Sequence, residues 1–143
     1  MTDLSKGIIE IEGFEIHSST MSAELNNRLG VLCHQHAVSK SGKVEIFIFK
    51  KVNILNRCFD ADVTFIRQRL SEITLYSYYD NDLSYEGRFQ ADCEWLKNLL
   101  GEPMSVSDED NTYYYDGLRI YSFIQRDLSR NPAETFICCK YGG

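Results

Sequence analysis

Hydrophobic and polar residues alternate with a period of two near the start of the chain. Ile9 and Ile11 alternate with glutamates, and after Gly13 the phase shifts so that Phe14 and Ile16 take the apolar positions. This alternation is typical of a strand with one buried face, and a glycine within it indicates a bulge or a turn. The pattern predicts a first strand that is interrupted at Gly13.

A helical period follows this segment. The hydroxyl side chains at positions 18–20 are suited to accept hydrogen bonds from the free N–H groups of a first helical turn, and Glu24 favours the positive end of a helix dipole. We therefore expect a short helix that starts after these residues and ends near Gly30. Four apolar residues share its predicted face: Met21, Leu25, Leu29 and Leu32.

The middle of the chain is rich in β-branched and aromatic residues. Positions 44–49 are almost entirely apolar, which predicts a central strand of a sheet. Positions 63–66 and 73–76 predict two more strands that join near Gln68, and 53–60 is expected to form a loop. This order predicts an antiparallel meander.

The clearest helix in the sequence follows the polar segment 80–84. Gly101 and Pro103 end it, because glycine adopts the left-handed cap conformation and proline cannot extend a helix. Asp92 is expected on a different face from the apolar one. The predicted apolar face consists of Tyr85, Phe89, Cys93, Leu96 and Leu100.

The last third of the sequence predicts three antiparallel strands. An acidic loop is expected over 104–111, a tight hairpin turn at Asp116-Gly117, and a second turn over 127–133 before a final strand at 135–141. The predicted fold is thus a single α+β domain over residues 1–143. It consists mainly of an antiparallel sheet of about six to eight strands, in meanders, packed against two helices.

Composition and charge narrow the classes of function. With 143 residues, 43% of them hydrophobic, the chain is long enough for one core and too apolar to be disordered. The net charge of -6 and the lack of a basic patch argue against nucleic acid or anionic membranes as partners. Five cysteines without regular spacing, and an N-terminus without a basic segment followed by an apolar one, lead us to expect a cytoplasmic protein.

Residues capable of catalysis or metal binding are few and scattered. Cys33, His34 and His36 form the one metal-like group, but no further ligands lie near them in the sequence, and no glycine-rich phosphate loop occurs. We therefore expect no metal, no cofactor and no catalytic activity. A small enzyme or ligand-binding domain with a pocket near these three residues is the alternative, and a homo-oligomeric structural protein is another.

Tyrosines and carboxylates occur together in two segments, 76–82 and 108–116. Tyrosine offers a large contact area with a polar tip, and nearby carboxylates attract a cationic partner, so both segments are candidates for a protein interface. The candidate partner-binding residues are Tyr78, Tyr79, Asp80, Asp82, Asp108, Glu109, Asp110, Tyr114 and Asp116.

The chain resembles small bacterial immunity proteins, which neutralise the toxin domains of contact-dependent inhibition and related polymorphic toxin systems. The resemblance rests on the small size, the acidic charge, the α+β order, and the segment 95–103 (Trp-Leu-Lys-Asn-Leu-Leu-Gly-Glu-Pro) followed by a strand meander. It implies a protein that forms a tight complex with a basic toxin domain, such as a nuclease, and covers its active site. Because immunity families share no common signature, no site residue is transferred.

Overall fold

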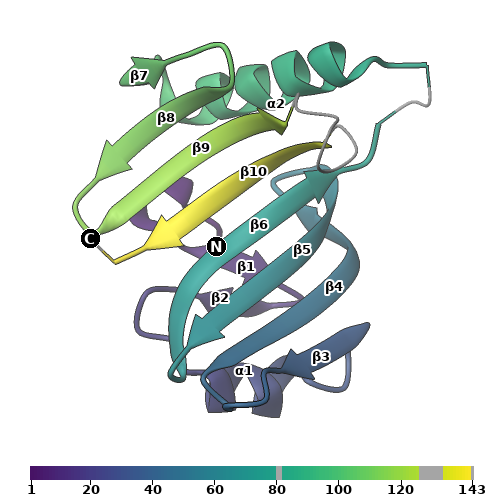
Figure 1. The fold of residues 1–143 in the computed structure, drawn as a ribbon, viewed down its shortest axis with the longest axis vertical. Helices are drawn as coiled ribbons and strands as arrows, with labels where there is room; N and C mark the ends of the chain where they lie inside the picture. The colour runs from purple at the N-terminus through teal and green to yellow at the C-terminus, as the bar shows by residue number, and fades with distance from the viewer. Residues whose placement is uncertain (80–81, 126–133, 143) are drawn as a thin grey trace.

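The computed structural model describes residues 1–79, 82–125 and 134–142, and in this part the fold is α+β, as the sequence predicts (Figure 1). Two antiparallel sheets are present, one of two strands and one of eight. The larger sheet has the strand order β3-β4-β5-β6-β10-β9-β8-β7. Because β6 pairs with β10, strands from both halves of the chain form one continuous sheet.

The N-terminal region forms a hairpin and a short helix. Residues 9–16 form two paired strands rather than one interrupted strand, because Glu12 and Gly13 both have positive φ and make a two-residue turn. The expected hydroxyl cap of the helix is wrong: the Glu24 carboxylate accepts the Met21 N–H at 3.2 Å, and the Thr20 hydroxyl accepts the His17 N–H instead. The elements are a 3₁₀ turn Leu4–Lys6, β1 Ile9–Ile11, β2 Phe14–Ile16 and α1 Ser22–Leu29.

Four strands follow, and two of the predictions for this region are wrong. The segment 53–60 is not a loop, because only Leu55 and Asn56 separate β4 from β5, both with positive φ. The strand predicted to be central is β4, which lies next to the edge strand β3. The meander and the turn near Gln68 are confirmed. The bounds are β3 Gln35–Val38, β4 Val44–Ile54, β5 Arg57–Ile66 and β6 Arg69–Ser77.

Helix α2, Tyr85–Leu100, is confirmed at both ends. The Ser84 hydroxyl accepts the Gly87 N–H at 3.1 Å, and Gly101 adopts a φ of 82° directly after the last turn. The Tyr113 hydroxyl donates to the carbonyl of Gly101 at 2.8 Å, which holds the helix end against the sheet. The expected position of Asp92 is wrong: its side chain is fully buried between the helix and the sheet.

The C-terminal region forms the predicted meander. The hairpin turn at Asp116-Gly117 is confirmed, while the expected acidic loop contains a short strand and the beginning of another. The turn predicted over 127–133 lies outside the described residues. The strands are β7 Ser105–Val106, β8 Asp110–Tyr115, β9 Leu118–Gln125 and β10 Glu134–Tyr141.

One face of the large sheet carries the core. Helix α2 packs behind β9 and β10, while the β1-β2 hairpin and α1 lie behind β4 and its neighbours (Figure 1). On the opposite face no helix or strand of the described chain covers the sheet. No helix in the described ranges is long and apolar enough to cross a membrane. The largest side chains that are fully buried in the described part of the chain are Tyr113, Phe47, Phe49, Phe59, Phe65, Ile9, Ile11, Ile16, Leu25, Ile54, Ile73 and Leu75.

Candidate functional site

The face of the sheet that no helix or strand of the described residues covers is the main candidate for a functional surface. Side chains alternate along each strand, so every second residue of the central strands points away from the core. We call this surface the open face. Its central side chains are Asp60, Asp62, Glu72, Thr74, Tyr76, Asp110, Thr112, Tyr114, Arg119, Tyr121, Phe123, Glu134, Phe136, Cys138 and Lys140.

Aromatic rings form a cluster at the centre of the open face. The ring of Phe136 on β10 lies 5.2 Å from Phe123, 6.0 Å from Tyr76 and 6.4 Å from Tyr121, measured between centroids. All four side chains are half-buried. Rings at these separations stabilise one another, so the cluster offers a preformed apolar surface with polar tips.

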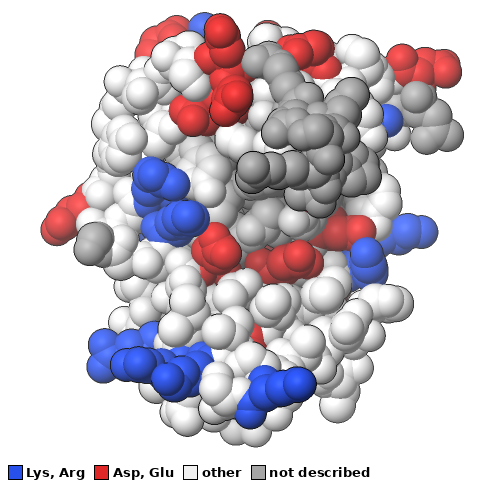
Figure 2. Space-filling view, in the orientation of Figure 1, with Lys and Arg blue, Asp and Glu red and all other residues white. Residues whose placement is uncertain are grey.

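Acidic side chains surround this cluster. Five of the carboxyl groups on the open face are Asp60, Asp62, Glu72, Asp110 and Glu134, against the cations Lys50, Arg119 and Lys140. Figure 2 shows acidic groups at the upper end and in the middle of this face, with basic groups at its side and lower end. The surface therefore carries an excess of negative charge near its centre.

The pKa values of two of these carboxyl groups are shifted in opposite directions. Partial burial raises the pKa of Asp62, and the nearby carboxylates add to this effect. Asp60 is also desolvated, but hydrogen bonds from the Tyr78 hydroxyl, the Lys51 N–H and the Lys50 ammonium outweigh burial and lower its pKa. Asp60 is therefore stabilised in its ionised form by the protein itself. The ionised form of Asp62 is instead stabilised when a cation comes close to it.

Cys138 lies on the same face, directly opposite Tyr121 in the pairing of β9 with β10. Its side chain is only 1% exposed, and its thiol lies 3.5 Å from a Glu72 carboxylate oxygen and 3.9 Å from the Thr74 hydroxyl. Burial raises the pKa of Cys138 to about 11, so the group is a neutral thiol near pH 7. Its neighbour Cys139 points into the core on the other face.

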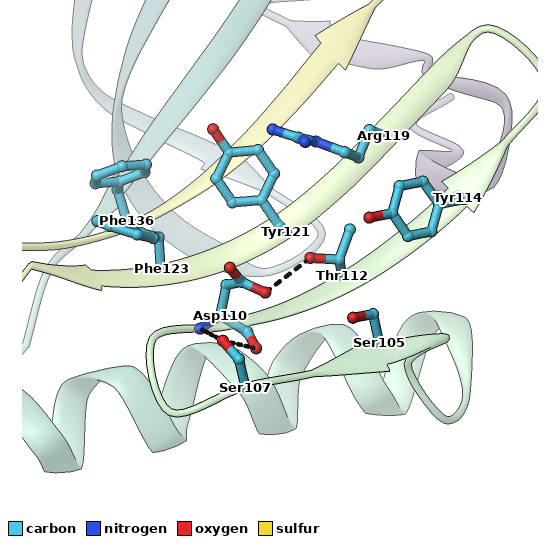
Figure 3. Close-up of a pocket in the computed structure, with 9 residues that line it drawn as sticks. All are labelled: Ser105, Ser107, Asp110, Thr112, Tyr114, Arg119, Tyr121, Phe123 and Phe136. Atoms are coloured by element: carbon cyan, nitrogen blue, oxygen red, sulfur yellow. Dashed lines mark hydrogen bonds between the residues drawn. The ribbon is translucent and has the colours of Figure 1, made fainter.

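A pocket of about 420 Å³ opens on the open face between β7 and β10 (Figure 3). Arg119 lies at one end with its guanidinium carbon 4.7 Å from the centroid of the Tyr121 ring. Asp110 lies at the other end, where its carboxylate accepts the Thr112 hydroxyl at 3.1 Å. The lining residues are Ser105, Ser107, Asp110, Thr112, Tyr114, Arg119, Tyr121, Phe123 and Phe136.

In the first predicted interface segment, 76–82, one tyrosine has a structural contact and other residues are exposed. Tyr79 is half-buried and its hydroxyl donates to Asp92, so this side chain holds α2 against the sheet. Tyr78 is 46% exposed and donates to Asp60 at the border of the open face. Asp82 is exposed beyond the end of β6, and Asp80 lies outside the described residues.

The second predicted segment extends along the whole of β8. Asp108 and Glu109 are exposed in the turn before β8, where the Ser107 hydroxyl accepts the N–H groups of Glu109 and Asp110. Asp116 is exposed in the turn that follows β8. An extended strand places it roughly 20 Å from Asp110 at the other end of β8. The structure thus brings Asp110 and the 52% exposed Tyr114 together in the pocket and leaves Asp116 apart from them.

The candidate cluster at residues 33–36 has separate local contacts. The Cys33 thiol donates to the carbonyl of Gly30 at 3.0 Å, while His36 pairs with Glu45 at 3.0 Å and stacks on Phe47 at 4.0 Å between ring centroids. Across residues 1–79, 82–125 and 134–142, no three His, Cys, Asp or Glu side chains are grouped closely enough to hold a metal ion.

Sequence reasoning did not select four of the residues that shape the open face: Arg119, Tyr121, Phe123 and Phe136. The available signal is the alternation within 118–125, where Leu, Ile, Ser and Ile face the core and Arg, Tyr and Phe take the intervening positions. Large aromatic residues on the side of a strand that faces away from the core indicate a surface that is used for binding.

Comparison with known proteins identifies no relative of this chain. No protein-family model, curated protein or solved structure matches the chain. The open face and its pocket are therefore the features from which a function is inferred.

Proposed function

We propose that this chain is a non-catalytic protein-binding module, an immunity protein that neutralises a cognate toxin domain in the cytoplasm. It acts by stoichiometric occlusion: the open face covers the active site or substrate groove of the toxin. The observation that carries the proposal is the half-buried cluster of Tyr76, Tyr121, Phe123 and Phe136 on a sheet face that no described helix or strand covers.

The aromatic cluster supports a protein partner. Interface cores are enriched in Tyr and Phe, because these side chains bury a large area and lose little conformational entropy. Three of the rings pack around Phe136, so the surface is ordered before a partner arrives. A preorganised surface loses less free energy on association than a flexible one.

The charge of the open face supports a basic partner. The chain has 21 acidic and 15 basic residues, and two carboxyl groups lie opposite members of the aromatic cluster, Asp60 opposite Tyr76 and Asp110 opposite Phe123. A nuclease domain carries a positive groove that binds nucleic acid phosphates, so acidic groups such as Asp62 and Glu134 would meet complementary charge there. Acidic side chains then steer the association, and the aromatic centre provides the buried contact.

The test is a binding measurement with a toxin domain: where the reading frame immediately upstream of this chain encodes a secreted protein with a variable C-terminal domain, that domain is the partner to use. Glu134→Arg reverses a charge on the open face, and Glu94→Arg reverses an exposed charge on the outer side of α2. We expect at least tenfold weaker binding and loss of protection from toxicity for Glu134→Arg, with no change for Glu94→Arg. Equal affinity of both variants and the unmodified chain would remove the open face from the interface.

A second pair of substitutions tests the acidic turn before β8. Asp108→Lys together with Glu109→Lys reverses two exposed charges next to the open face. If this turn contributes to the interface, the double variant weakens binding, with most of the effect in the association rate and at low salt. Unchanged affinity would remove this turn from the interface and leave the aromatic centre as the contact surface.

A further inference from the structure

The pocket between β7 and β10 combines an aromatic wall with two opposite charges. Its volume of about 420 Å³ falls within the range of roughly 300–1,000 Å³ that is typical of small-molecule sites. Phe123 and Phe136 form the wall at the end that contains Asp110, since Phe123 pairs directly with Asp110 across β8 and β9. This arrangement offers an apolar contact directly beside a carboxylate.

The guanidinium of Arg119 lies at the other end of the pocket, and one of its N–H groups has no hydrogen-bond partner among the described residues. Its guanidinium lies over the Tyr121 ring, and its Nε–H is buried without a hydrogen-bond partner in the described part of the chain. No carboxylate of the described residues lies within ion-pair distance of Arg119 or forms a salt bridge with it. A planar guanidinium in this state is suited to a carboxylate on a ligand, which it binds through paired N–H groups.

The two charges are separated by a distance that a short peptide spans. The guanidinium lies over Tyr121, which pairs with Thr112, and Asp110 lies two residues further along β8. Two residues of strand correspond to about 7 Å. An extended dipeptide covers about the same length, at roughly 3.3–3.6 Å per residue.

We infer that this pocket binds a free dipeptide with an aromatic N-terminal residue. The dipeptide ammonium group binds the Asp110 carboxylate, its first side chain packs on Phe123 and Phe136, and its carboxylate binds Arg119. The hydroxyl groups of Ser105 and Tyr114 also line the pocket, and the Thr112 hydroxyl, which donates to Asp110, can accept a hydrogen bond from the peptide N–H (Figure 3). This site needs no protein partner, so the inference does not depend on the proposed function.

The probe for this site is the dipeptide Phe-Gly, titrated into the ¹⁵N-labelled full chain across the millimolar range. We expect saturable shifts of the amide signals of Thr112, Tyr121 and Phe123. Gly-Phe, which places its ring at the Arg119 end, should bind at least fivefold more weakly. The N-acetylated and the C-amidated forms of Phe-Gly each lose one charged contact and should bind at least tenfold more weakly.

Two substitutions assign each charge of the ligand to its protein partner. Arg119→Gln should weaken Phe-Gly at least tenfold and abolish the preference over the C-amide, whereas Asp110→Asn should abolish the preference over the N-acetyl form. Arg67→Gln, at an exposed position of the β5-β6 turn, is the matched control and should leave the affinity unchanged. The capped peptides on the unmodified chain give the same information if a variant fails to fold.

Absence of saturable shifts with Phe-Gly, or equal affinities for the free and both capped forms, would overturn the inference. So would a preference for free Phe-Gly over its C-amide that Arg119→Gln leaves intact. The result is separate from that of the toxin-binding test, because Glu134→Arg lies outside the pocket lining and the peptide titration contains no toxin domain.

Discussion

Arg57 and Asp92 form an ion pair between the large sheet and helix α2, with 3.1 Å between Nη2 and Oδ1. The Asp92 side chain is fully buried, and its Oδ1 also accepts the hydroxyls of Ser77 and Tyr79. The guanidinium of Arg57 lies 5.6 Å from the centroids of the Phe59, Tyr79 and Trp95 rings. This cluster fixes α2 behind the sheet at the end where β5 begins and β6 ends.

Removal of the Asp92 carboxylate should destabilise the fold strongly. Asp92→Ala leaves the Arg57 cation and two hydroxyl groups without their acceptor, and loss of one partner of a buried pair typically costs about 3–5 kcal/mol. Glu102→Ala is the matched control, since it breaks the exposed Lys97–Glu102 pair, where a loss of about 0–1 kcal/mol is expected. Urea unfolding measures both changes. If both variants lost a similar amount of unfolding free energy, the buried pair would contribute no more to stability than the exposed one.

Asp60 should make stability depend on acid pH. Its folded pKa lies below the ordinary value of 3.8, so its contribution is fully present above that value and is lost as the pH falls through the folded pKa. Asp60→Asn should therefore lower the free energy of unfolding at pH 7, and the difference from the unmodified chain should shrink below about pH 3.8. Urea titrations at pH 7 and pH 3 measure this difference. A difference that grows toward low pH would contradict the assignment, and Asp82→Asn serves as an exposed control.

The five cysteines should differ in reactivity according to their burial. Cys58 is exposed, whereas Cys138 and Cys139 are 1% and 0% exposed. Burial raises the pKa of Cys138 to about 11 and that of Cys139 further, so neither forms the reactive thiolate near neutral pH. A maleimide at pH 7 should label Cys58 within minutes and leave both buried thiols unlabelled until the chain unfolds. Peptide mass spectrometry identifies the labelled positions, and early labelling of Cys138 would contradict its placement.

The elements that sequence patterns predict well are those with local signals. Helix α2 has a complete set of signals, from the Ser84 cap to Gly101, and the Asp116-Gly117 turn has a characteristic residue pair. The β4-β5 turn has none, because Leu55 and Asn56 are not a typical pair for positive φ. The segment around it was therefore predicted to be a loop, although Val52, Ile54 and Phe59 alternate as strand residues do.

The candidate site depends on strand pairings that local sequence patterns do not indicate. Phe136 contacts Tyr76 because β10 inserts beside β6, and a strand order of this kind is set by packing of the whole sheet. Asp92 is expected on a face other than the apolar one, and the sequence does not indicate its burial because its partner Arg57 lies 35 positions earlier in the chain. Tyrosine and aspartate content indicated a binding surface, but which tyrosines face away from the core follows from the register of the strands.

The β4-β5 turn itself gives the last prediction. A leucine with a φ of 49° is in the left-handed region, which is unfavourable for residues other than glycine, asparagine and aspartate. Leu55→Asn places a residue that tolerates this region at the first turn position and should raise the free energy of unfolding by about 0.5–1 kcal/mol. Leu55→Val places a β-branched residue at the same φ and should lower it. Thermal and urea unfolding measure both variants. Destabilisation by asparagine equal to that by valine would show that the 36% exposed Leu55 side chain contributes more through packing than it loses through its backbone conformation.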